Sequence, residues 1–220
     1  MELSIEIAGY IQAKNQQRLE QAIDNNPELA EGRTPQGITL LTLAAYCRNQ
    51  QAVNLILTRK SSMDLYEAAA VGNVEMVRRH LQNDPAQINS FAVDGFTPLS
   101  LACYFGYEDL VSYLLANGAE VNLPSKNVFG SCPLHSACAV GHIPIVKQLL
   151  AHQANVHLRQ NSGATALHVA ASRAHLEVCK LLIKAGAAVE ALNASRQTPI
   201  QLAEDKGHSE LVAYFRSLKD

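Results

Sequence analysis

The chain has 220 residues, of which 48% are hydrophobic and 17% charged, and its net charge at pH 7 is −2. This balance favours neither a nucleic-acid-binding surface nor a basic membrane-binding face. No apolar stretch of about 18 residues occurs, and the first residues lack the pattern of a signal peptide, so we expect neither a membrane span nor secretion. The cysteines Cys47, Cys103, Cys132, Cys138 and Cys179 follow no paired spacing. They indicate small core residues of a protein in the reducing cytoplasm.

The opening of the chain predicts a pair of helices over residues 3–25. Apolar residues recur at helical spacing around Ile5–Ile11 and again around Leu19–Ile23. The outward faces are rich in Gln, Asn and Glu, as expected where a terminal repeat must keep one side in water. A second unit then begins at Gly37 and runs through the apolar residues up to Leu57.

The third unit, near residues 61–91, is short. Thr39 and Met63 take the same place in successive units, although only 24 residues separate them. Compared with a full repeat, about ten residues of loop are therefore missing at 58–63. We expect the row of loops to be interrupted there, while the helix stack continues because the apolar helix positions keep their phase. A boundary between two sub-arrays remains the alternative.

A repeated pattern governs the remaining chain. One slot holds Gly95, Gly130, Gly163 and Arg196, at intervals of 35, 33 and 33 residues. Further slots follow in the same order: Thr97, Cys132, Thr165 and Thr198; then Ala102, Ala137, Ala170 and Ala203; then Gly106, Gly141, Ala174 and Gly207. A period in this range predicts a stacked array in which each unit contacts only its neighbours.

Each slot has a physical reason. At Thr97-Pro98 the Thr hydroxyl can accept a bond from an unpaired helix N–H, and Pro has no N–H to lose at the first helical position. The small Ala residues let the two helices of a unit approach closely, and Gly suits the sharp reversal between them. Paired apolar residues such as Leu149-Leu150 supply the stripe that packs on the next unit.

Four segments carry a family resemblance: Gly163-Ala-Thr-Ala-Leu-His-Val-Ala-Ala171, Gly141-His142, Leu110-Val111 and Gly118-Ala-Glu-Val-Asn122. With these the chain resembles the ankyrin-repeat family over residues 30–215. The resemblance implies an all-α ankyrin-repeat solenoid of about six to seven helix–turn–helix units with projecting hairpin-like loops. We expect a single domain over residues 1–220 with approximate units at 3–30, 34–60, 61–91, 92–126, 127–159, 160–192 and 193–220.

The histidines invite a metal or catalytic interpretation, which we weigh against a structural one. The resemblance implies structural roles for His135 and His168 in one slot and for His142, His175 and His208 in another. No paired His or Cys spacing indicates a metal site, so we expect no metal, no cofactor and no catalytic residue. Two alternatives stay open: a metal or small ligand held by the stacked histidines, and a catalytic Cys132–His135 pair.

The aromatic residues suggest where a partner binds, because none lies between Phe129 and Tyr214. The resemblance implies partner-facing slots in the loops and at the ends of the helices. In this chain we assign them to Tyr46, Val93, Asp94, Phe96, Tyr104, Phe105, Asn117, Val128, Phe129, Ser172 and Arg173. Asn161 falls in such a slot as well. Exposed aromatics rimmed by polar residues are typical of interface anchors.

Two further expectations concern this surface. A two-residue insertion within Leu123–Phe129 predicts a loop longer than its neighbours. The alternative to an aromatic binding surface is that Tyr104 or Phe105 folds back onto its own stack and that Phe129 packs under its loop.

The sequence thus predicts a cytoplasmic, non-enzymatic scaffold or adaptor that binds a protein partner through a concave face and loop tips. We expect a monomer that binds neither nucleic acid nor a membrane. A small-ligand or metal binder and a regulatory subunit of an enzyme are the alternatives.

Overall fold

The computed structural model describes residues 2–218, which form fourteen α-helices and two short 3-10 helices. Within this range the β-structure consists of isolated bridges, and none of the helices is long and apolar enough to cross a membrane. The chain divides into two compact units, one ending at Pro98 and the other beginning at Leu99. The single domain over residues 1–220 stays a prediction.

The first unit stacks three helix pairs. They are α1 (Glu2–Gln12) with α2 (Gln16–Asn25), α3 (Leu40–Tyr46) with α4 (Gln50–Arg59), and α5 (Leu65–Ala70) with α6 (Val74–Asn83). Two 3-10 helices, η1 (Pro27–Glu31) and η2 (Pro85–Asn89), follow α2 and α6. The opening pair agrees with the sequence pattern, since Ile7, Ile11, Leu19 and Ile23 are fully buried between its helices and the next pair. The apolar spacing therefore decides which face of each helix lies inside.

The third repeat has a short connection in place of a loop. It comprises residues 60–64, between α4 and α5. A charged cluster holds it in place. Lys60 is almost fully buried, and its Nζ pairs with Glu31 and lies 3.2 Å from Oε1 of the buried Glu67. The backbone N–H and the hydroxyl of Ser61 each donate to Oε1 of Glu31 at 2.9 Å. These bonds, led by that of Lys60, lower the pKa of Glu31 to about 2.

The helix stack continues across this connection because α3 packs against both α1 and α5. The prediction that the row of loops is interrupted there is wrong. A Cβ added to Gly37 would lie 3.1 Å from Cγ2 of Val93, and the hydroxyl of Tyr46 donates to Oδ2 of Asp94 at 2.7 Å. The loop of the second repeat therefore lies directly against that of the fourth, because the third repeat has no loop to separate them.

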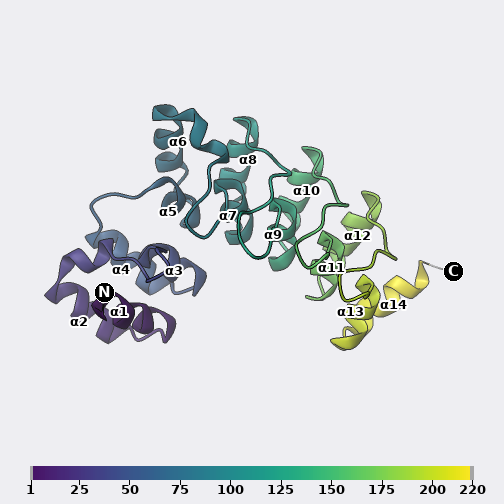
Figure 1. The fold of residues 1–220 in the computed structure, drawn as a ribbon, viewed down its shortest axis with the longest axis horizontal. Helices are drawn as coiled ribbons and strands as arrows, with labels where there is room; N and C mark the ends of the chain where they lie inside the picture. Colours follow the sequence, from purple (N-terminus) through teal and green to yellow (C-terminus); the bar gives the residue numbers. More distant parts are fainter. Residues whose placement is uncertain (1, 219–220) are drawn as a thin grey trace. The chain divides into compact units, whose positions relative to one another are not determined.

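The second unit stacks four helix pairs in chain order (Figure 1). They are α7 (Pro98–Phe105) with α8 (Glu108–Ala116), α9 (Pro133–Val140) with α10 (Ile143–Ala151), α11 (Ala166–Ala171) with α12 (Leu176–Lys184), and α13 (Pro199–Asp205) with α14 (Ser209–Ser217). First helices pack on first helices, as α9, α11 and α13 do, and second helices on second helices, as α8, α10 and α12 do. Each interior pair is thus buried on two sides.

The reversal between the helices of a pair uses a left-handed residue, as the Gly slot predicts. Gly141 has φ +75°, and a Cβ there would also lie 2.8 Å from the ring of His175 in the next pair. Glycine is needed at this position both for the backbone conformation and for the close approach of the ring. Ala174 occupies the same slot with φ +58°, a conformation that costs a residue with a Cβ more than it costs Gly.

Candidate protein-binding surface

The loops that precede the first helices project as short hairpins, which we call fingers. In one of them Gln160 N–H donates to Ala164 O at 2.8 Å, and Gly163 N–H donates to Gln160 O at 2.8 Å. The same two bonds recur in the other regular fingers, and isolated bridges join Arg33 to Thr39 and Arg159 to Thr165. The fingers comprise residues 33–39, 92–97, 125–132, 159–165 and 193–198. The hairpin-like loops expected from the sequence are therefore present.

The finger at residues 125–132 is longer than the others. Its closing bond runs from Ser125 N–H to Ser131 O at 2.9 Å and spans six residues, whereas the corresponding bond from Gln160 to Ala164 spans four. This difference confirms the two-residue insertion predicted from the sequence.

The tip of the long finger presents two apolar side chains to solvent. Val128 is 81% exposed and Phe129 is 59% exposed. The side chain of Asn127 orders the turn, since its Oδ1 accepts from Phe129 N–H at 3.0 Å and from the Ser125 hydroxyl at 2.9 Å. The alternative in which Phe129 packs under its loop is therefore wrong.

The next finger fixes this tip from the side. Asn161 N–H donates to Phe129 O at 2.9 Å, and its side-chain amide donates to Val128 O at 3.2 Å and to Asn127 O at 3.4 Å. Gly130 faces the same side chain, because a Cβ there would lie 2.5 Å from Asn161 Oδ1. Asn161 was expected to face a partner, but its side-chain amide forms hydrogen bonds with the neighbouring finger. Pattern reasoning missed the ordering roles of Ser125 and Asn127, for which Asn at a turn is the available signal.

In the first unit the structure brings four expected site residues together. Tyr46 at the end of α3 bonds to Asp94 in the finger, and Val93 beside Asp94 is 64% exposed. Phe96 is half-buried, and its N–H donates to Oδ1 of Asp94 at 3.3 Å. Asp94 thus joins the finger to the helix end, and Val93 is the apolar side chain left in solvent.

In the second unit Tyr104 and Phe105 form an aromatic pair at the end of α7. Their ring centroids lie 5.2 Å apart in an edge-to-face arrangement, and both residues are half-buried. The ring of Tyr107, which the sequence did not assign to the site, lies 6.3 Å from that of Phe105. Burial raises the pKa of the Tyr107 hydroxyl. The cluster therefore combines packing within the stack with partial exposure.

The remaining expected site residues differ in role. Asn117 caps the C-terminus of α8, and its side-chain amide donates to Tyr113 O at 2.7 Å. Ser172 caps α11, and its hydroxyl donates to Val169 O at 2.9 Å. Arg173 is exposed next to it. Asn117 and Ser172 thus have local structural bonds, whereas Arg173 extends into solvent.

The buried histidines close helix N-termini. Nδ1 of His135 accepts from Cys132 N–H and Nδ1 of His168 accepts from Thr165 N–H, both at 3.2 Å. The proton of His168 then lies on Nε2, which donates to Gln197 O at 3.0 Å. In α13 Gln201 takes the same place, and its Oε1 accepts from Thr198 N–H at 2.8 Å.

The electrostatics of Cys132 and His135 oppose a catalytic pair. Burial lowers the pKa of His135 to about 4 and raises the pKa of the Cys132 thiol to about 11. A nucleophilic pair needs a thiolate stabilised by a protonated ring, and both shifts favour the neutral forms instead. Among residues 2–218 no group of three or more His, Cys, Asp or Glu side chains is arranged to hold a metal ion.

The comparisons with known proteins agree with this architecture. The family model described as "Ankyrin repeats (3 copies)" matches residues 41–125, 65–160 and 134–219, and so covers most of the chain. The chain belongs to the ankyrin-repeat family. The helix pairs, the fingers and the left-handed reversals of this ankyrin-repeat protein follow from that fold.

Several curated ankyrin-repeat relatives match parts of the chain. Human "Ankyrin repeat and SAM domain-containing protein 3" is 36% identical over 63 residues, which are 29% of this chain and 10% of that protein. Mouse "Protein phosphatase 1 regulatory subunit 27" is 36% identical over 80 residues, or 32% of this chain and 51% of that protein. Human "DNA-binding protein RFXANK" is 30% identical over 105 residues, or 46% of this chain and 40% of that protein. The chain thus spans at most about half the length of these relatives.

Proposed function

We propose that this ankyrin-repeat protein is a non-enzymatic scaffold or adaptor that binds a protein partner through its fingers and the inner ends of its first helices. The observation that carries the proposal is the tip of the long finger, where Val128 and Phe129 are 81% and 59% exposed on a loop that Asn127 and Asn161 hold in place. Exposed apolar side chains on a fixed backbone are suited to anchor a partner.

A fixed tip favours binding because ordering a mobile loop on association opposes the affinity. The bonds from Asn161 to two carbonyls of the tip supply that order before a partner arrives. The five free cysteines fit a reducing compartment such as the cytoplasm, where we propose that the chain acts as a monomer without a cofactor. The alternative function is that of a regulatory subunit of an enzyme, which is what the name of the mouse relative says of that protein. In this chain we propose that such a role would use the same surface.

A pull-down from native lysate, read by mass spectrometry, tests the proposal. One bait is the wild type and the other carries Val128→Ser and Phe129→Ser. Both side chains are exposed, so the fold should persist, and matching helical circular dichroism checks this. We expect at least one protein to be retained by the wild type and reduced about tenfold or more on the variant, as for loss of a central anchor.

The matched control is Ile5→Ser on α1, where Ile5 is 53% exposed and thus as accessible as Phe129. This variant should retain the same protein as the wild type. If all three baits retain the same protein equally, the long finger is not part of the binding site. No specific protein on any bait would contradict the proposed function itself.

A further inference from the structure

In the second unit the ends of the first helices form a continuous row. Gly141 faces the ring of His175, and Nε2 of His208 lies 3.3 Å from Ser172 O. Gly106 similarly faces the ring of His142. Residues 104–107, 139–142, 172–175 and 205–208 are therefore neighbours in that order. We call these residues the junction row.

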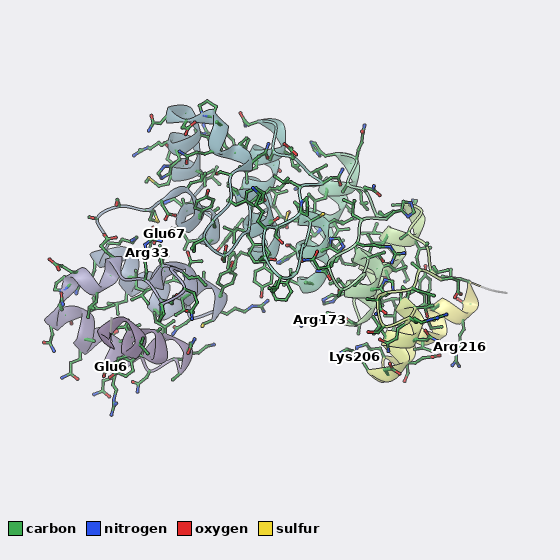
Figure 2. All side chains as sticks on the ribbon, viewed as in Figure 1. Glu6, Arg33, Glu67, Arg173, Lys206 and Arg216 are labelled. Carbon is green, nitrogen blue, oxygen red and sulfur yellow. The ribbon has the colours of Figure 1, made fainter. Side chains whose placement is uncertain are left out.

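The chemistry of the junction row changes along its length. It begins with the aromatic pair Tyr104 and Phe105 and continues with the small apolar residues Ala139 and Val140. It then reaches the basic residue Arg173 and, one repeat later, Lys206. Figure 2 shows Arg173 and Lys206 close together at the ends of α11 and α13, and both are exposed. The row is thus apolar at one end, and its other end carries two exposed cations together with the carboxylate of Asp205.

The fingers of the second unit show a similar change from apolar to basic residues along the chain. The long finger has the exposed Val128 and Phe129 beside Lys126, and the two fingers after it carry Arg159 and Arg196. Arg159 Nη1 donates to two carbonyl oxygens, which leaves its charge without a carboxylate. The exposed Val128 and Phe129 therefore lie at the same end of the unit as the aromatic pair, together with the cation Lys126, and Arg159 and Arg196 lie towards the other end.

The acidic residues do not neutralise these cations. Among residues 99–218, six of the carboxylates lie on the second helices or the loops that follow them: Glu108, Asp109, Glu120, Glu177, Glu190 and Glu210. Glu204 on α13 accepts from Arg216 at 2.8 Å, and Asp205 accepts from Gln197 at 2.7 Å. No ion pair within residues 2–218 joins Arg173 or Lys206 to a carboxylate. Asp205 is thus the one carboxylate of residues 99–218 that lies in the junction row itself, and its bond goes to Gln197. Most of the negative charge of these residues lies elsewhere, which favours a positive field around Arg173 and Lys206.

We propose that the partner segment is an extended acidic peptide with a hydrophobic anchor at one end, a statement that rests on the proposed function. The anchor lies against Tyr104, Phe105 and the tip of the long finger, and carboxylates pair with Arg173 and Lys206. Stacked helices lie about 8–10 Å apart, so the two cations are about 20 and 30 Å from the aromatic pair. An extended peptide rises about 3.3 Å per residue, which places its acidic residues about six and nine positions from the anchor.

A random-peptide library displayed on phage tests this inference, with the full chain as bait. The wild type should enrich peptides in which an apolar or aromatic residue is followed or preceded by Asp or Glu at about that spacing. The double variant Arg173→Glu with Lys206→Glu should bind these peptides with an affinity lower by about tenfold or more. In its own selection it should enrich peptides with Lys or Arg at those positions. Both residues are exposed, so the fold should not change.

Lys147→Glu with Lys184→Glu, on the exposed faces of α10 and α12, is the matched charge reversal. It should enrich the same peptides as the wild type. Enriched peptides that need Phe129 but show no acidic preference would overturn the inference and leave the proposed function standing. A single-stranded oligonucleotide that binds the wild type more tightly than the enriched peptides, and does so equally well after Phe129→Ser, would overturn it in favour of nucleic acid. Absence of any enrichment would also overturn it.

Discussion

In α5, α9, α11 and α13 the third residue of the helix closes the helix N-terminus, with different chemistry from repeat to repeat. The position holds Glu67 in α5, His135 in α9, His168 in α11 and Gln201 in α13. Each side chain accepts the backbone N–H three residues earlier, at 2.8 to 3.2 Å. The requirement is an acceptor at a fixed distance, and the acceptor's other properties vary freely.

His135→Gln should make the protein less sensitive to acid. Burial lowers the pKa of His135 to about 4, so the unfolded chain, with a usual His pKa near 6.5, takes up the proton first. Stability from this residue is therefore full above about pH 6.5 and falls as the pH drops towards 4, by about 2 kcal/mol between pH 7 and 5. Gln keeps the acceptor, as Gln201 shows, but has no proton to gain.

Urea unfolding of the wild type and His135→Gln at pH 8, 7 and 5 measures this effect. The difference in unfolding free energy between the two proteins should be constant from pH 8 to 7 and should shift in favour of the variant at pH 5. An equal loss of stability in both proteins between pH 7 and 5 would contradict the prediction. It would mean that the ring of His135 takes up its proton in the folded protein as readily as in the unfolded chain.

At the scale of one element, the connection between α4 and α5 replaces a finger with a charge cluster. Lys60 is 6% exposed and lies between Glu31 and the 3% exposed side chain of Glu67. At the end of the same connection Asp64 pairs with Arg33 at 3.5 Å. Removing one partner of a buried pair leaves an uncompensated charge, which is costly.

Lys60→Met should therefore destabilise the protein by about 3–5 kcal/mol, because it leaves the carboxylate of Glu67 buried without its cation. Arg59→Ala is the control one residue away. Its ion pair with Asp24, at 2.9 Å, is exposed and should contribute less than about 1 kcal/mol. Chemical unfolding measures both. A loss for Lys60→Met no larger than that for Arg59→Ala would mean that the cluster does not stabilise the connection.

At the scale of the whole molecule, the repeat period predicts most of the fold, because one pattern determines the helix pairs of the second unit and apolar spacing supplies the opening pair. Gly141 and Thr198 could be placed from that pattern, and the long finger could be deduced from the spacing alone. The contact between Gly37 and Val93 could not be predicted from the pattern, because it arises from the absence of a loop in the third repeat. Within the candidate site, the exposure of Phe129 at the finger tip could be predicted from the sequence. The hydrogen bonds from Asn161 to the neighbouring finger could not, because they join residues more than 30 positions apart in the chain.

Stacking also predicts that stability is unevenly distributed. In the second unit α11 packs against α9 and α13, whereas α13 has α11 as its neighbouring first helix. In the first unit α3 packs on both α1 and α5, whereas within residues 2–218 α1 packs on α3 as its neighbouring first helix. A pair that is covered on one side loses less apolar contact when it opens, and repeat arrays open from such pairs.

Hydrogen exchange followed by mass spectrometry in low urea should therefore show α1, α2 and α14 exchanging first, and α3 and α11 last. The free energies of opening should range from near zero at the terminal pairs to the global value in the interior pairs. Val128→Ser with Phe129→Ser should leave this order unchanged, because both side chains are exposed. Exchange of all helices at a single rate would instead mean that the chain unfolds as one cooperative body, with coupling between repeats stronger than nearest-neighbour contacts supply.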